Sequence, residues 1–204
     1  MKHPILEGIF KLIINNKALP NYHAERRIDI FINYFIERIL SSYLGKETIF
    51  ICPEFPLKKA DTNQSTKLDY LCKTENEIIF VELKTDAFSL KTVQANIYLE
   101  CKWDQCLSDF ITITNSVTNK THKEKYNTLV SAINELKFPL GIPNIRIIYL
   151  SPLPKENSLF AKSISIIKLK KLNDLRITLH KDENIVWNFL NKLDLYIFEI
   201  KHKE

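Results

Sequence analysis

Glycine is scarce in this chain, with three residues among 204. Phosphate-binding loops of the Walker type and dinucleotide-binding turns depend on closely spaced glycines. No such spacing occurs here, so both classes of nucleotide site are excluded. The sequence also lacks any apolar run of the ~18 residues that a membrane helix needs, and its amino terminus lacks the pattern of a secretory signal. We therefore expect a cytoplasmic protein that does not enter a membrane.

The chain also lacks a Cys-x-x-Cys motif. Its four cysteines are Cys52, Cys72, Cys101 and Cys106, two in expected strands and two on one expected helix. This distribution is typical of reduced, mostly buried thiols in an intracellular protein. An iron–sulfur cluster is the alternative, but the spacing does not match a set of cluster ligands.

The overall composition is that of an ordinary globular protein. Hydrophobic residues make up 45% of the chain and charged residues 26%, which is enough apolar side chain for a substantial core. The net charge of +5 is mildly basic and is compatible with nucleic acid without requiring it. No repeat, linker or low-complexity segment interrupts the sequence, so we expect one domain over residues 1–204.

Hydrophobic periodicity predicts an α/β fold. The expected helices cover residues 4–15, 22–44, 88–110, 123–137 and 182–192, and the expected strands cover residues 47–57, 67–74, 77–84, 144–150 and 163–169. Pro53 and Pro56 indicate that the first strand is bent or lies at a sheet edge. The Thr- and Asn-rich residues 111–122 are expected to form a loop, and the last ten residues either a strand or a helix.

The chain is organised around one hairpin, whose two expected strands meet at Glu75-Asn76. With this two-residue loop, Asp69 lies opposite Glu82, and both share a face of the hairpin with Lys84. Facing carboxylates repel, and the other hairpin side chains are nearly all apolar, so the pair needs a cation or a shared proton. A solvated sheet face of mixed charge is the alternative, but it does not explain apolar residues on both faces.

Glu37 is a third carboxylate of interest. Its helical offsets place it at the edge of a largely apolar face of the helix expected over residues 22–44. Either it is brought to the hairpin carboxylates, or it is a surface residue paired with a nearby basic side chain such as Arg38 or Lys46.

Two further pairs of residues are candidates for substrate contacts. Gln94 and Tyr98 lie one turn apart on the helix that follows the hairpin, either beside the carboxylates or as the border of an amphipathic face. Lys58 and Lys59 belong to a polar loop, where they either contact phosphates or are simply solvated.

The order helix, three strands, helix, strand resembles the PD-(D/E)xK nuclease superfamily over about residues 22–151, with residues 152–204 as an extension. Thr85 and the later Gln-x-x-x-Tyr spacing look like the RecB-type branch, and Leu68 replaces the proline that names the superfamily. The residues that carry the resemblance are Glu37, Asp69, Glu82, Lys84, Gln94 and Tyr98.

The resemblance implies a restriction-endonuclease-like core, in which helices flank a mixed central sheet. It also implies phosphodiester hydrolysis, with DNA as the expected substrate and Mg²⁺ or Mn²⁺ as the cofactor. The implied metal ligands are Asp69, Glu82, the backbone carbonyl of Leu83, and Glu37. Lys84 would orient the attacking water, and Gln94 and Tyr98 would position the nucleic-acid backbone or the waters of the site.

Two other functions remain open at this point. The chain is either a catalytically silent, nuclease-like subunit for nucleic-acid binding or assembly, or a metal-binding domain unrelated to nucleic acids. It has no separate DNA-reading domain, so a homodimer or a partner protein is expected to supply substrate recognition.

Overall fold

The computed structural model describes residues 4–16, 24–58, 65–85, 92–151 and 163–198 of the chain. In chain order its elements are α1 (Pro4–Asn16), α2 (Ala24–Leu44), β1 (Ile49–Lys58), β2 (Ser65–Lys73), β3 (Glu77–Leu83), α3 (Thr92–Glu100), α4 (Trp103–Ser116), α5 (Lys120–Asn134), β4 (Asn144–Ser151), β5 (Ser165–Lys168), the 3₁₀ helix η2 (Leu169–Asp174) and α7 (Asn184–Phe198). Within the described ranges, no helix combines the length and the hydropathy of a membrane span.

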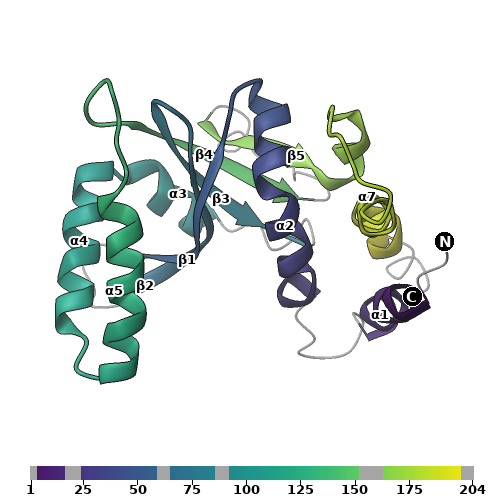
Figure 1. Ribbon diagram of the computed structural model, residues 1–204, viewed down its shortest axis with the longest axis horizontal. Helices are drawn as coiled ribbons and strands as arrows, with labels where there is room; N and C mark the ends of the chain where they lie inside the picture. Colours follow the sequence, from purple (N-terminus) through teal and green to yellow (C-terminus); the bar gives the residue numbers. More distant parts are fainter. Residues whose placement is uncertain (1–3, 17–23, 59–64, 86–91, 152–162, 199–204) are drawn as a thin grey trace. The chain divides into compact units, whose positions relative to one another are not determined.

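The fold is α/β, with a five-stranded mixed sheet and flanking helices, as the periodicity predicts (Figure 1). The strand order is β1-β2-β3-β4-β5. By packing, the chain divides into two compact units. The first unit contains Met1–Lys46, Leu83–Leu90 and Tyr149–Glu204, and the second contains Glu47–Glu82 and Lys91–Ile148.

The expected hairpin is present in the second unit, with the expected turn. β2 and β3 pair antiparallel in a register that includes Tyr70 opposite Val81. The N–H of Thr74 donates to the carbonyl of Glu77 across 2.9 Å, which closes the two-residue turn. The predicted register is therefore confirmed. β2 also pairs antiparallel with β1, so the three strands form a meander.

β1 lies at the edge of the sheet, as its two prolines predict. Its pairing with β2 shifts between Phe50 and Cys52, so the edge strand is irregular. Phe55, farther along β1, is fully buried, and its ring lies 5.2 Å from the ring of Phe110 on α4. Figure 1 shows α4 and α5 side by side, and both helices contact β1. This packing forms the core at the β1 end of the second unit.

The single helix expected over residues 88–110 is wrong. α3 ends at Glu100, where the N–H of Cys101 donates to the carbonyl of Tyr98 across 3.3 Å and tightens the last turn. Lys102 has an extended backbone and precedes α4, which begins with the buried Trp103. The apolar side chain of Val93, in the first turn of α3, is 74% exposed.

The loop expected over residues 111–122 is wrong as well, because α4 continues to Ser116. The hydroxyl of Thr112 donates to the carbonyl of Ser108 across 2.9 Å, and Ser116 makes a similar bond to Ile113 across 2.7 Å. These bonds to the preceding turn keep Thr and Ser side chains within a helix. Asn119 then caps α5 by accepting a hydrogen bond from the backbone of His122.

In the first unit, three helices pack through aromatic rings. Phe10 of α1 stacks on Phe189 of α7, with ring centroids 4.0 Å apart. Phe35 of α2 contacts Trp187 of α7 edge to face, with centroids 5.1 Å apart. Gly45 adopts a φ of 66° directly after α2, which confirms the expected helix end.

Other expectations for the first unit need correction. On α1, Phe10 and Ile13 are buried, while the apolar side chains of Ile5 and Leu12 are exposed. The strand expected over residues 163–169 is the shorter β5, followed by a 3₁₀ turn. α7 extends past the expected residue 192 to Phe198.

Candidate functional site

Glu82 is a carboxylate inside a buried strand. It lies near the end of β3, whose other residues after Glu77 are all apolar, and only 2% of it is exposed. Placing a carboxylate in such a position is costly unless hydrogen bonds or charges compensate for the lost water. The partners of Glu82 therefore decide what this position can do.

Both oxygens of Glu82 accept hydrogen bonds from α3. The side-chain amide of Gln94 donates to Oε1 across 2.7 Å, and the hydroxyl of Tyr98 donates to Oε2 across 2.7 Å. The Gln94 amide also donates to the Tyr98 hydroxyl across 2.7 Å, so the three side chains form a closed triangle. All three belong to the second unit.

Local helix geometry produces this triangle. Gln94 and Tyr98 are four residues apart on α3, so they lie one turn above each other on the same face of the helix. Tyr98 is 1% exposed, and its ring packs edge to face on Phe80 of β3, with centroids 6.1 Å apart. This contact fixes the height of the phenol hydroxyl beside the strand.

The two donors orient the Glu82 carboxylate without cancelling its charge, because an amide and a phenol are both neutral. The arrangement is suited to a carboxylate that binds a cation, since neutral second-layer donors hold a ligand in place and preserve its negative charge.

Asp69 directly precedes Tyr70 on β2, and Tyr70 pairs with Val81. Extending that register by one residue places Asp69 opposite Glu82, on the same sheet face. Asp69 is partly exposed, whereas Glu82 is buried. The two predicted carboxylates thus occupy facing positions at the end of the hairpin away from its turn.

Glu37, Leu83 and Lys84 belong to the first unit. Lys84 is 8% exposed, and its backbone N–H donates to the carbonyl of Leu150 on β4 across 2.8 Å. Leu83 is buried, while Glu37 is exposed on α2. The guanidinium of Arg38, one of the partners considered for Glu37, donates to both oxygens of Glu183.

The two loop lysines differ in what the structure describes. Lys58 is exposed at the end of β1, and its amine lies 3.9 Å from a carboxylate oxygen of Asp109 on α4. An exposed pair at this distance contributes little stability. Lys59 lies outside the described residues.

Ser151 is a further polar residue that the sequence interpretation did not select. It ends β4, is completely buried, and its hydroxyl has no hydrogen-bond partner within the described part of the chain. The signal in the sequence is a serine that closes an apolar strand. Buried hydroxyls are normally bonded, so Ser151 is a buried polar group whose partner lies beyond the contacts of the described residues.

Strand direction places Ser151 next to Lys84. Arg146 of β4 donates to Glu77 at the start of β3, whereas Leu150 bonds Lys84 just after β3 ends. The two contacts advance together along both strands, so β3 and β4 are parallel. In a parallel pair, the backbone N–H of a residue donates to the carbonyl of the residue that precedes its cross-strand neighbour. Lys84 and Ser151 are therefore neighbours across this pair.

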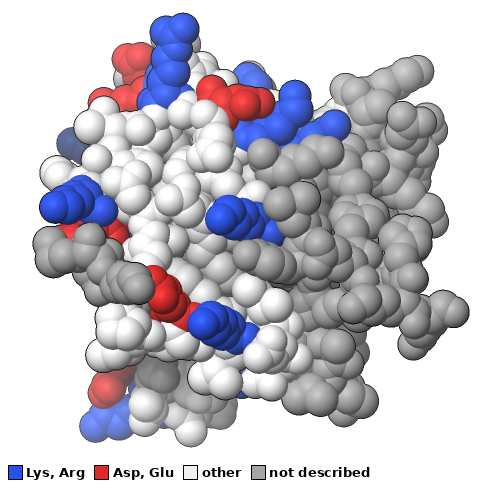
Figure 2. Space-filling model, turned by 90° about the vertical axis from the view of Figure 1, so that its right-hand side faces the viewer, with Lys and Arg blue, Asp and Glu red and all other residues white. Residues whose placement is uncertain are grey.

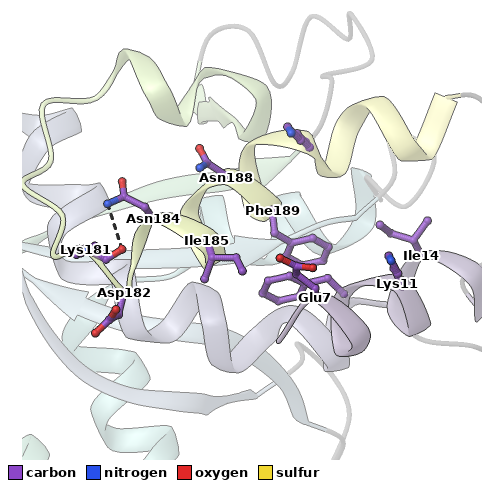
Figure 3. Close-up of a pocket in the computed structure, with 11 residues that line it drawn as sticks. Glu7, Lys11, Ile14, Lys181, Asp182, Asn184, Ile185, Asn188 and Phe189 are labelled. Atoms are coloured by element: carbon purple, nitrogen blue, oxygen red, sulfur yellow. Dashed lines mark hydrogen bonds between the residues drawn. The ribbon is translucent and has the colours of Figure 1, made fainter. Parts of the chain in front are cut away.

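A pocket of about 470 Å³ in the first unit is a second candidate site (Figure 3). Figure 3 shows α1 and α7 side chains facing it, including Glu7 and Lys11 from α1 and Phe189 from α7. Its lining also includes Lys181, Asp182 and Lys192. Charges of both signs line the opening, so they do not select a ligand of one charge, and the pocket is a weaker candidate than Glu82.

Basic residues do not gather into one area on the described part of the face in Figure 2, where Lys and Arg lie among Asp and Glu. Among the described residues, no group of three or more His, Cys, Asp and Glu side chains is placed to hold a metal ion. A site of two carboxylates is still sufficient for Mg²⁺, which is usually held by one or two carboxylates, several waters and the substrate phosphate. Asp69 and Glu82 are two carboxylates at facing positions of the hairpin.

Comparison with known protein families, curated proteins and solved structures finds no match to this chain.

Proposed function

We propose that this protein is a metal-dependent nuclease that hydrolyses phosphodiester bonds, with DNA as its substrate. The observation that supports this most strongly is the hydrogen-bonded triangle that holds the buried Glu82 through Gln94 and Tyr98. A buried carboxylate aligned on both oxygens by neutral donors is prepared to bind a cation. The antiparallel meander followed by a parallel β4 also supports a core of the restriction-endonuclease type.

Asp69 and Glu82 would hold Mg²⁺ or Mn²⁺, because hard cations prefer carboxylate oxygens. The backbone carbonyl of Leu83 and the carboxylate of Glu37 are further proposed ligands. When bound, the ion supplies a more acidic water and offsets negative charge on the phosphate. Gln94 and Tyr98 hold the Glu82 carboxylate in one orientation, which lowers the cost of ordering it on binding.

Lys84 follows Glu82 by two residues and is almost completely buried. We assign it to orienting the attacking water and to stabilising the negative charge that develops on the phosphate oxygens. Ser151, its neighbour on β4, is a further hydroxyl that can accept from or donate to such a water. Lys58 and the net charge of +5 favour approach of a polyanion.

The test is cleavage of supercoiled plasmid, linear duplex and single-stranded DNA, each with Mg²⁺, Mn²⁺ or a chelator. The comparison is between the wild type and Glu82→Gln, a substitution that keeps the shape of the side chain and removes its charge. We expect metal-dependent cleavage by the wild type and loss of at least ~100-fold in the variant, since a direct ligand is removed.

The matched control is Glu75→Gln, the same substitution in the exposed turn of the same hairpin. It should retain wild-type cleavage. Folded wild-type protein that binds Mn²⁺ and DNA but cleaves none of the three substrates would contradict the nuclease. That outcome would favour a catalytically silent subunit for nucleic-acid binding or assembly. Metal binding without DNA binding would instead favour a metal-binding domain unrelated to nucleic acids.

A further inference from the structure

The sheet face that carries Asp69 opens to solvent along β2. Side chains two residues apart share a face, so Leu71, Asp69 and Lys67 lie in one row. Leu71 is completely buried, Asp69 is partly exposed, and the Lys67 side chain is 60% exposed. On the other face of the strand, Leu68 and Tyr70 are both completely buried. A solute that enters from the exposed end of this row therefore meets Lys67 before Asp69.

Lys67 is held by a carboxylate from the neighbouring strand. Its amine donates to Oε2 of Glu54 on β1 across 2.6 Å, and the Glu54 side chain is 69% exposed. Pro53 pairs with Tyr70 in the register of β1 and β2. The next position in that register sets Glu54 opposite Asp69. All of these residues belong to the second unit, so the exposed ion pair lies directly beside the candidate site.

The two members of the pair differ in how firmly they are placed. Within the described ranges, Glu54 alone among residues other than glycine has a positive φ, of 50°. Residues with a side chain rarely adopt this left-handed conformation, so the surrounding fold must hold it. Lys67 instead carries its charge on a flexible four-carbon stem. Because an exposed ion pair contributes little stability, the Lys67 amine can exchange Glu54 for another anion at little cost.

We propose that Lys67 binds a backbone phosphate of the nucleic acid beside the candidate site, and that Glu54 holds the amine until that phosphate replaces it. Lys67 and Asp69 are two residues apart, which separates them by about 6.6 Å along the strand. This spacing is close to that of neighbouring phosphates in a nucleic-acid strand. A phosphate bound at Asp69 thus brings the next phosphate within reach of Lys67. The subsite rests on the proposed nuclease function and adds the residue that takes the phosphate next to the one hydrolysed.

The test is binding of a fluorescent DNA duplex, measured by anisotropy with Ca²⁺ in place of Mg²⁺ and over a range of KCl concentrations. Each phosphate contact steepens the dependence of log affinity on log salt by about 0.9. Lys67→Gln should therefore flatten that slope by about 0.9 and weaken binding about 8-fold at about 0.1 M salt. Lys67→Arg keeps the charge and should retain the wild-type slope.

The matched control is Lys171→Gln in the other unit. Lys171 is 61% exposed and lies 3.9 Å from a carboxylate oxygen of Asp174, so it is also one half of an exposed ion pair. This variant removes the same charge from the protein and should bind DNA like the wild type. All of these variants should unfold in urea like the wild type, because exposed ion pairs contribute little stability.

Glu54 is tested by a gain in affinity. Glu54→Gln releases the amine and should tighten DNA binding about 2–5-fold, the equilibrium equivalent of one exposed ion pair. In the Lys67→Gln background the same substitution should have no effect, because no amine is left to release. An equal gain in both backgrounds would reveal general repulsion of DNA by Glu54 and would overturn the exchange.

The outcomes separate this subsite from the nuclease itself. Wild type that binds DNA, with Lys67→Gln binding as tightly as Lys171→Gln, would overturn the subsite and leave the nuclease to be decided by Glu82→Gln. The expected changes in binding without any cleavage in Mg²⁺ or Mn²⁺ would support the phosphate contact and contradict the nuclease. Wild type that binds no DNA, with or without the ion, would overturn both proposals.

Discussion

Removing one oxygen atom from Tyr98 tests the hydrogen-bonded triangle at Glu82. Tyr98→Phe keeps the ring contact with Phe80 but deletes the hydroxyl, which donates to Glu82 and accepts from Gln94 across 2.7 Å in each case. A hydrogen bond to a charged group contributes about 1.5–3 kcal/mol to stability, and a neutral one about 0.5–1.5 kcal/mol. The Gln94 amide keeps its bond to Glu82, so only these two bonds are lost, and we expect a total loss of about 2–4.5 kcal/mol.

Such a loss is measurable by urea unfolding. It is a large part of the ~5–15 kcal/mol that stabilises an ordinary protein, and the midpoint should fall without a change in the dependence on urea. The control is Tyr126→Phe, the same change on α5, where the hydroxyl makes no hydrogen bond within the described part of the chain. That variant should stay within about 0.5 kcal/mol of the wild type.

The same variant also tests the role assigned to the triangle. If Gln94 and Tyr98 hold Glu82 for a cation, Tyr98→Phe should weaken Mn²⁺ binding by about 10–100-fold in calorimetry, as loss of second-layer partners does elsewhere. A variant that unfolds like Tyr126→Phe and binds Mn²⁺ like the wild type would refute the reasoning. A loss of stability with unchanged Mn²⁺ affinity would leave the triangle as packing alone and would remove its role in the site.

Three more outcomes are expected. Lys84→Ala should abolish DNA cleavage while circular dichroism shows an intact fold; wild-type rates would remove Lys84 from the mechanism. Asp69→Asn should weaken Mn²⁺ binding in calorimetry, and unchanged affinity would take Asp69 out of the metal site. Hydrogen bonds from Arg38 lower the pKa of Glu183 to about 2 from an ordinary 4.5, so this contact stabilises the protein above pH 4.5 and its contribution falls as the pH drops toward 2. In urea unfolding, Glu183→Gln should accordingly be less stable than wild type at pH 7 but closer to it at pH 3, and a gap independent of pH would count against the contact.

The hairpin shows which parts of this fold follow from local rules. A two-residue turn between two strands allows only one pairing register. Side-chain alternation then decides which residues share a face of the hairpin. The expected pairing of the strands around Glu75-Asn76 was confirmed for this reason. The edge position of β1 followed from its prolines, which cannot donate within a central strand.

Helix boundaries depended on contacts that the sequence does not display. Apolar residues continue at helical spacing across Cys101 and Lys102, so periodicity alone predicts one helix there. The break comes from the backbone bond between Cys101 and Tyr98 and from the burial of Trp103 against β1, where its ring faces Phe55. α4 continues through a Thr- and Ser-rich segment because those hydroxyls bond to the preceding turn.

The candidate site likewise contains residues that local sequence rules predict and one residue that only the fold reveals. A carboxylate within an apolar strand is visible in the sequence, and it requires polar partners wherever the chain folds over it. Gln94 and Tyr98 could be named in advance because their spacing puts both on one helix face, close behind the strand in sequence. Ser151 could not be named, because its position next to Lys84 follows from the pairing of β3 with a strand more than 60 residues later. A charge inside a strand therefore predicts polar partners before the structure is known, whereas the neighbours supplied by parallel pairing emerge only from the fold.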